Sequence, residues 1–163
     1  YNYYSGEGVT GFDQGRPVFL RKPDATMDLA TFMRTHLTSA LATLKLGMDI
    51  LREEHVEIDR LYGHGGYFKA PEVGQRLLSA AIGVPVSVME AAGEGGPYGM
   101  ALLSAYMIWN TGESLEDYLD DKVFHTAATK TLMASADDVE GFNRFAEHYK
   151  KTLTVERAAV ESY

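Results

Sequence analysis

The feature that most constrains this sequence is an alternation of helical and strand-like segments along its middle part. An apolar stripe at steps of three or four residues predicts a long amphipathic helix from about Asp28 to Glu54, with Asp28 as its N-cap. Two short apolar runs, 58–62 and 85–89, predict buried strands, and helices are expected over 72–82 and 97–109. Strands that alternate with helices imply parallel pairing through right-handed crossovers. The sequence therefore predicts an α/β fold.

The segments on either side of this core are expected to be simpler. Residues 1–27 are rich in Gly, Pro and aromatic residues and are expected to be loop, with one short strand over Arg16–Arg21. Residues 110–163 are expected to form a helical tail, whose last helix begins near Asp137 with Ser135 as its cap. The 163 residues suit a single domain, in which 28–109 form the α/β core.

One predicted helix is expected to lie deep in the core. Residues 97–109 are apolar nearly all round, which is typical of a buried helix, and Pro97 suits the first helical position. Four methionines and two histidines are also expected in the core or at an interface: Met33, Met48, Met100, Met107, His36 and His125.

Composition limits the class of function. The chain carries 15 basic and 23 acidic residues, a formal net charge of −8, which argues against non-specific binding to nucleic acid or to anionic membranes. It has no cysteine, so disulfides, thiolate nucleophiles and cysteine-type zinc sites are excluded, and a cytoplasmic setting is expected. No run of about 18 apolar residues predicts a membrane span.

The first candidate site is the glycine segment Gly63-His64-Gly65-Gly66, which follows a predicted strand. Adjacent glycines let the backbone approach a ligand closely, and open α/β sheets bind ligands beyond the carboxyl ends of their strands. The alternative is a plain tight turn. His64 is the one histidine inside a candidate site, and a purely structural role fits it as well.

The second candidate is Gly93-Glu94-Gly95-Gly96, which precedes the apolar helix. A helix N-terminus offers free N–H groups and partial positive charge to a phosphate. The segment is neither a Walker A loop nor a GxGxxG motif, and its glycines could equally serve close packing of the helix on the sheet. The histidines show no metal-ligand spacing, and neither glycine segment contains a convincing general base.

Joined in order, several motifs resemble the C-terminal domain of FGGY-family carbohydrate kinases, xylulose kinase-like members most closely and ribulokinase-like members next. They are Ser5-Gly6-Glu7, Gly11, Arg16-Pro17, Arg34 on the long helix, and the run Ile58–Tyr106 with its glycine segments, Gln75, Pro85-Val86 and Gly99-Met100-Ala101. The resemblance covers residues 1–109, and the family also tends to end in a helical tail.

The resemblance implies one lobe of an actin-like ATPase (ribonuclease H-like) fold, with ATP and sugar bound in a cleft between two lobes and Mg²⁺ on the phosphates. It places nucleotide contacts at Gly65, Gly66, Tyr67, Lys69 and Glu94. Tyr67 stands where a small residue is common in the family, and Lys69 stands where relatives often carry Asn or Ser.

The catalytic Asp of such kinases lies in the N-terminal lobe, so no catalytic or metal-binding residue is assigned to this chain. The chain is expected to be part of a longer two-lobe kinase and inactive alone. It is also expected to form a homo-oligomer, either through an unpaired sheet edge or through the apolar N-terminal segment. Its sugar is not named by the sequence. Two alternatives stay open: a non-catalytic actin-like binding or assembly module, and an actin-like kinase of a non-sugar substrate.

Overall fold

The computed structural model describes residues 1–89, 92–125 and 127–162. The chain divides into two compact units. Unit 1 comprises Tyr1–Ile58, Ala80–Gly83 and Ala134–Tyr163, and unit 2 comprises Asp59–Ser79 and Val84–Met133. The single domain over 1–163 and its three-part division stay a prediction.

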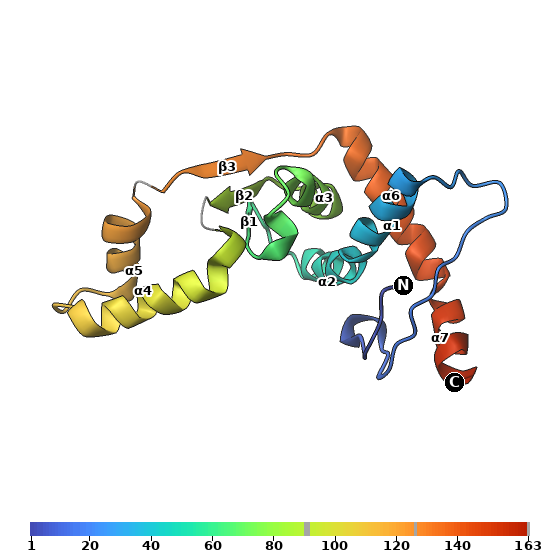
Figure 1. The fold of residues 1–163 in the computed structure, drawn as a ribbon, viewed down its shortest axis with the longest axis horizontal. Coiled ribbons are helices and arrows are strands. Elements are labelled where there is room, and N and C mark those ends of the chain that lie inside the picture. Colours follow the sequence, from blue (N-terminus) through green and yellow to red (C-terminus); the bar gives the residue numbers. More distant parts are fainter. Residues whose placement is uncertain (90–91, 126, 163) are drawn as a thin grey trace. The chain divides into compact units, whose positions relative to one another are not determined.

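A small mixed sheet forms the centre of unit 2 (Figure 1). Its three strands are β1 (Leu61–Gly63), β2 (Val86–Met89) and β3 (Thr129–Leu132), in the order β1-β2-β3. β1 pairs parallel with β2, which confirms the predicted parallel pair within a few residues of the predicted bounds. β3 pairs antiparallel with β2. The tail over 110–163, which was predicted to be helical, contains helices but also this strand, which the prediction missed.

Side-chain hydrogen bonds join the two antiparallel strands. The buried Gln75 donates from Nε2 to the carbonyl of Val86 in β2 at 3.1 Å and to the carbonyl of Lys130 in β3 at 2.7 Å. The Ser87 and Thr131 hydroxyls lie 2.7 Å apart across the pair. Since strand β3 is largely exposed, these polar contacts supply much of what holds it in place.

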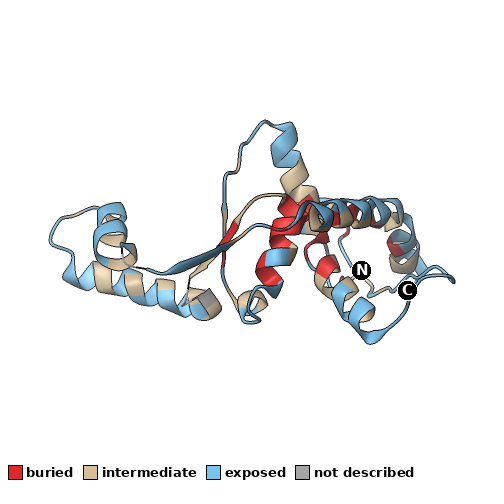
Figure 2. Ribbon diagram, turned by 90° about the horizontal axis from the view of Figure 1, so that it is seen from above, coloured by how far each residue is buried: buried red, intermediate tan, exposed pale blue. Residues whose placement is uncertain are grey.

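Helix α3 (Val73–Ile82) connects β1 to β2 and carries residues of both units. Leu78, Ala80, Ala81 and Ile82 are buried along it (Figure 2). The helix ends before Gly83, whose φ of 78° is the left-handed conformation that commonly follows a helix. The helix predicted over 72–82 is confirmed.

The long helix predicted over 28–54 is two helices in unit 1, α1 (Leu29–Ser39) and α2 (Ala42–Glu53). Asp28 caps α1 as predicted, with its Oδ1 accepting the N–H of Thr31 at 2.7 Å. The helix is interrupted at Ala40–Leu41. Leu41 and Ala42, at this interruption, are buried, with 8% and 1% of their surface exposed. A continuous apolar stripe could not reveal the break, because the stripe resumes after it.

The core of unit 1 gathers around aromatic residues of the N-terminal segment. Tyr3 and Phe12 pack with Ala42 of α2 and with Tyr149 of α6 (Ala136–Lys151). The Tyr149 hydroxyl donates to the Tyr3 hydroxyl at 2.7 Å, and burial raises the pKa of Tyr149 far above its usual range. Ser135 caps α6 as predicted. α7 (Leu153–Ser162) follows and buries Glu156 completely.

The segments that flank this core differ from expectation. A 3-10 turn, η1, spans Gly8–Thr10. No strand forms over Arg16–Arg21, and the extended chain there makes one isolated bridge, Asn2 to Pro17. A strand needs a partner along its length, and the described part of unit 1 offers this segment a single pairing.

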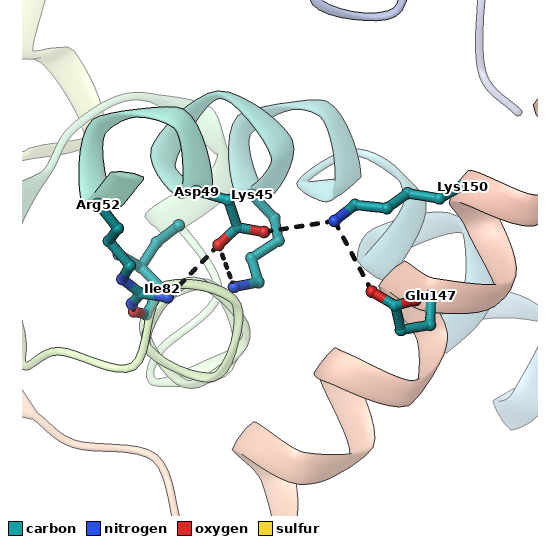
Figure 3. Close-up of polar contacts among 6 residues, drawn as sticks. All are labelled: Lys45, Asp49, Arg52, Ile82, Glu147 and Lys150. Atoms are coloured by element: carbon teal, nitrogen blue, oxygen red, sulfur yellow. Dashed lines mark hydrogen bonds and ion pairs between the residues drawn. The ribbon is translucent and has the colours of Figure 1, made fainter. Parts of the chain in front are cut away.

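An ion-pair cluster centred on Asp49 links the helices of unit 1 (Figure 3). Lys45, whose side chain is 7% exposed, donates to Asp49 Oδ1 at 2.6 Å, and Arg52 donates to the same oxygen at 3.4 Å. Lys150 of α6 lies 3.8 Å from Asp49 Oδ2, and Arg52 also donates to the Ile82 carbonyl. Asp49 therefore connects α2 to α6, and Arg52, which also pairs with Asp49, connects α2 to the C-terminal end of α3.

The apolar helix of unit 2 is not buried. α4 spans Gly95–Trp109, so Pro97 occupies its third position rather than its first. Within the described chain it has no buried residue, and Met107 is 81% and Trp109 72% exposed. Near its C-terminal end Tyr106 packs on Tyr118, with ring centroids 5.3 Å apart, and the Tyr106 hydroxyl donates to the Glu113 carbonyl at 2.8 Å. The apolar composition of this helix predicted that it is buried, and in the described structure it is largely exposed.

Other expected core residues also lie outward. Met33, Met100 and Met107 are more than half exposed, and His125 is exposed, whereas His36 and Met48 are half-buried. The remaining elements of unit 2 are short: η2 (Gly66–Phe68), η3 (Ala92–Glu94), α5 (Leu115–Tyr118) and the π-helical turn η4 (Leu119–Phe124). Among the described helices, none is long and apolar enough to cross a membrane.

Candidate functional site

The turn after β1 contains three glycines with three different roles. At Gly63 a Cβ would lie 2.5 Å from the Phe68 ring, so this glycine allows close packing. Gly65 has φ 93° and ψ −174°, a conformation that is essentially restricted to glycine. At Gly66 an added Cβ would meet nothing within 4 Å, although the backbone there is unstrained. Gly66 thus leaves open space at the surface of the turn.

The helix that follows is packed tightly beneath this turn. A Cβ at Gly74, near the start of α3, would lie 2.5 Å from the Tyr67 carbonyl oxygen. Tyr67 is half-buried and stacks edge-on against Phe68 at 5.7 Å. Burial raises the pKa of Tyr67 to about 12, so its hydroxyl stays neutral at physiological pH. Sequence reasoning missed Phe68 and Gly74; the signal was a glycine inside a helical pattern.

The second glycine segment lies beside the first. Lys69, just after η2, donates to Glu94 of η3 at 2.9 Å. A Cβ at Gly93 would be 3.4 Å from the Lys69 side chain, and one at Gly95 would be 3.1 Å from His64. The glycines at 93 and 95 therefore give room for Lys69 and His64.

The Lys69–Glu94 pair is a surface feature. The two side chains are 60% and 71% exposed, and exposed pairs contribute about 0–1 kcal/mol to stability. The pair places one positive and one negative charge next to each other beside the open glycine turn. Both charges remain accessible to a ligand.

These residues gather at one edge of the sheet. β1 ends at Gly63 and β2 ends at Met89, and because the two strands are parallel their carboxyl ends face the same way. Open α/β sheets bind ligands at this edge. α4 begins at Gly95 and adds the free N–H groups of a helix N-terminus beside His64.

No three acidic or histidine side chains come together as a metal site in residues 1–89, 92–125 and 127–162. Glu94 is the one carboxylate of the two glycine segments, and it is paired with Lys69. The described side chains of this site therefore do not fit a magnesium ion by themselves.

Comparison with known proteins decides the family. The model of the FGGY family of carbohydrate kinases, C-terminal domain, matches residues 1–108, well over half of the chain. The chain belongs to this family. Searches of the curated proteins and of the solved structures found no match. Membership in the FGGY family implies a carbohydrate kinase that uses ATP, generally with Mg²⁺.

The family match places both glycine segments inside the shared domain. It ends at residue 108, within α4, so β3, α6 and α7 lie beyond it. All five residues predicted to contact nucleotide lie in η2, in η3 or immediately beside them: Gly65, Gly66, Tyr67, Lys69 and Glu94. The fold brings them together, and their role as nucleotide contacts stays a prediction.

Proposed function

We propose that this FGGY-family chain forms the nucleotide-binding side of a kinase that transfers the γ-phosphoryl group of ATP to a hydroxyl of a pentulose of the xylulose type. The observation that carries the proposal is the open surface at Gly65 and Gly66, at the carboxyl ends of two parallel strands. We further propose that unit 2 is part of an actin-like, ribonuclease H-like lobe, as the helix–strand order suggests.

The residues of the site have separate roles in this proposal. Gly65 supplies a backbone conformation that other residues rarely adopt, and Gly66 leaves room for ribose or phosphate close to the main chain. Lys69 offers an ammonium to a phosphate or a donor to a ribose hydroxyl, and Glu94 holds it in place. Tyr67 contributes a neutral hydroxyl beside the same turn.

Phosphoryl transfer depends mainly on positioning and on electrostatic stabilisation of the transferred group. When Mg²⁺ is bound on the phosphates, it neutralises their charge; no step is assigned to it on this chain. Neither glycine segment supplies a proton acceptor for the sugar hydroxyl, because Glu94 is held by Lys69 on the nucleotide side. That acceptor and the sugar contacts are proposed to lie in another lobe.

Residues 1–163 alone are accordingly proposed to be inactive. Loss of a proton acceptor costs about 10²–10⁴ in rate, and loss of substrate orientation can cost roughly 7–11 kcal/mol more. ADP release by purified 1–163 with xylulose, ribulose and glycerol is expected to stay at background. Sugar-dependent ADP release that disappears in Glu94→Gln would show that the chain holds a complete site.

The nucleotide role is tested by Gly66→Val. Its side chain meets no protein atom near Cβ, so the fold should stand while the space needed by the nucleotide is filled. Gly8→Val is the matched control, because a Cβ there also meets nothing within 4 Å and the residue lies in unit 1. NMR titration of 1–163 with ATP should show millimolar binding that Gly66→Val removes and Gly8→Val keeps. Equal binding by both variants would refute the role.

Two further properties are proposed with the function. A cytoplasmic location is proposed, and a chain without cysteine, which can form no disulfide, is compatible with it. Self-association is proposed through the edge of β1, which within the described sheet pairs on one side alone. Light scattering at micromolar concentration should give a mass above that of one chain, and a monomer would contradict it.

A further inference from the structure

Unit 1 contains a cavity of about 720 Å³ that is distinct from the glycine turn of unit 2. It lies between the extended segment of residues 18–27 and the helices α1 and α6. Its volume is in the range of roughly 300–1,000 Å³ that is usual for small-molecule sites. Most of its surface is apolar, and the aromatic walls are Tyr1, Phe19, Phe145 and Tyr149.

The described lining of this cavity contains basic side chains and no acidic one. Among its described lining residues are Arg21, Lys22, His36 and His148, and no Asp or Glu. The whole chain carries a net charge of −8, so this concentration of basic groups is local. Arg21 and Lys22, called the rim pair below, line the cavity from the extended segment, and both are exposed to solvent.

The nearby carboxylates do not line the cavity. Asp28 accepts the N–H of Thr31 as the cap of α1, and the fully buried Glu156 accepts the N–H of Arg16 at 2.7 Å. Asp24 belongs to the same extended segment but does not line the cavity. These acidic groups do not stand on the cavity wall opposite the basic ones.

The walls are fixed before any ligand arrives. The Tyr1 hydroxyl donates to the Tyr149 carbonyl at 2.8 Å and lies 2.5 Å from the Thr152 hydroxyl. His36 packs edge-on against Phe32 at 4.5 Å and stacks on Phe19 at 6.3 Å. Because these wall hydroxyls are satisfied internally, they leave an apolar interior beneath a basic rim.

We propose that this cavity binds a small aromatic anion, whose ring enters between the aromatic walls and whose carboxylate, sulfonate or phosphate meets Arg21 and Lys22. Aromatic rings prefer offset or edge-on contacts with other rings, which such walls provide. Charge complementarity at the rim selects the anion over a neutral molecule of the same shape. The site is independent of the proposed nucleotide site.

The test compares two probes of the same shape, 2-naphthoate and the neutral 2-naphthylmethanol, by isothermal titration with chain 1–163. The anion is expected to bind about fivefold or more tightly, since exposed charge pairs contribute up to about 1 kcal/mol each. Arg21→Ala/Lys22→Ala should remove this preference while leaving the neutral probe unchanged. The matched control is Arg144→Ala/Lys151→Ala, which removes two exposed charges of α6 that do not line the cavity.

Thr35→Trp provides a second test, because it places a large ring inside the cavity from the surface of α1. It should abolish binding of both probes while circular dichroism stays that of the native chain. The proposal is overturned if neither probe binds, if the two probes bind equally, or if the control pair loses the preference as the rim pair does. Binding that survives Thr35→Trp would also overturn it, since the probe would then lie elsewhere.

Discussion

Gln75→Leu removes the side chain that joins β2 to β3. The glutamine is 5% exposed, and its amide donates to two main-chain carbonyls, those of Val86 and Lys130. Leucine has nearly the same volume and creates little cavity, so the effect isolates the two hydrogen bonds. A buried carbonyl left without a donor costs about 1–3 kcal/mol, as at Val86, and the part-buried carbonyl of Lys130 should cost less, so the change is expected to cost about 2–3 kcal/mol in all.

That loss is a large part of the roughly 5–15 kcal/mol by which a domain is usually stable. Urea unfolding followed by circular dichroism measures it, and hydrogen exchange should show the greatest loss of protection in β3. The control is Arg76→Leu, the neighbouring exposed position of α3, which should change the free energy of unfolding by no more than about 0.5 kcal/mol. If Gln75→Leu is as stable as Arg76→Leu, the carbonyls do not depend on Gln75 and the reasoning fails.

Three further predictions concern single side chains. Gly65→Ala should lower the free energy of unfolding by about 1–3 kcal/mol, because φ 93° with ψ −174° strains any residue with a Cβ. Chemical denaturation measures this change, and the control Gly66→Ala should leave the free energy of unfolding unchanged. Asp49→Asn should lower the free energy of unfolding by about 2–4 kcal/mol in the same assay, because it leaves the buried Lys45 without its anionic partner. Glu140→Gln, which breaks an exposed pair, should leave the free energy of unfolding nearly unchanged. The hydrogen bond from the Thr31 N–H lowers the pKa of Asp28. The stability that the ionised cap gives is therefore present above the ordinary pKa of 3.8 and is lost as pH falls through the lowered pKa. Acid unfolding of the wild type should show this loss of stability, and acid unfolding of Asp28→Asn should not.

The parallel half of the fold could be predicted from the sequence because each element carried its own local signal. The run 58–62 is followed directly by Gly63, a glycine segment begins four residues after the run 85–89, and the helix between the two runs has a clear apolar face, so β1, α3 and β2 could be predicted. β3 could not be predicted in this way. Thr129–Leu132 is a short segment with mostly exposed side chains, and it becomes a strand through its pairing with β2 and the amide of Gln75.

The candidate site was predictable for a similar reason and to a similar extent. Glycines after a strand indicate a place where a ligand can approach the backbone closely, and this pattern predicted Gly65 and Gly66 as site residues. The pairing of Lys69 with Glu94 depends on two turns that are distant in sequence, so no local pattern contains it. The cavity of unit 1 was also hidden, because its walls come from an extended segment and two helices that no motif connects.

The antiparallel pairing of β3 with β2 determines where the chain could be shortened. Met89 stands opposite Thr129 in the register, so the chain leaves β2 and comes back alongside it after the whole excursion 90–128. A five-residue turn in place of that excursion would keep all three strands aligned, and the shorter closure would cost about 2 kcal/mol less in chain entropy. Such a deletion would also remove Glu94 and α4, so it would separate the alignment of the three strands from the candidate nucleotide site, which depends on the excursion.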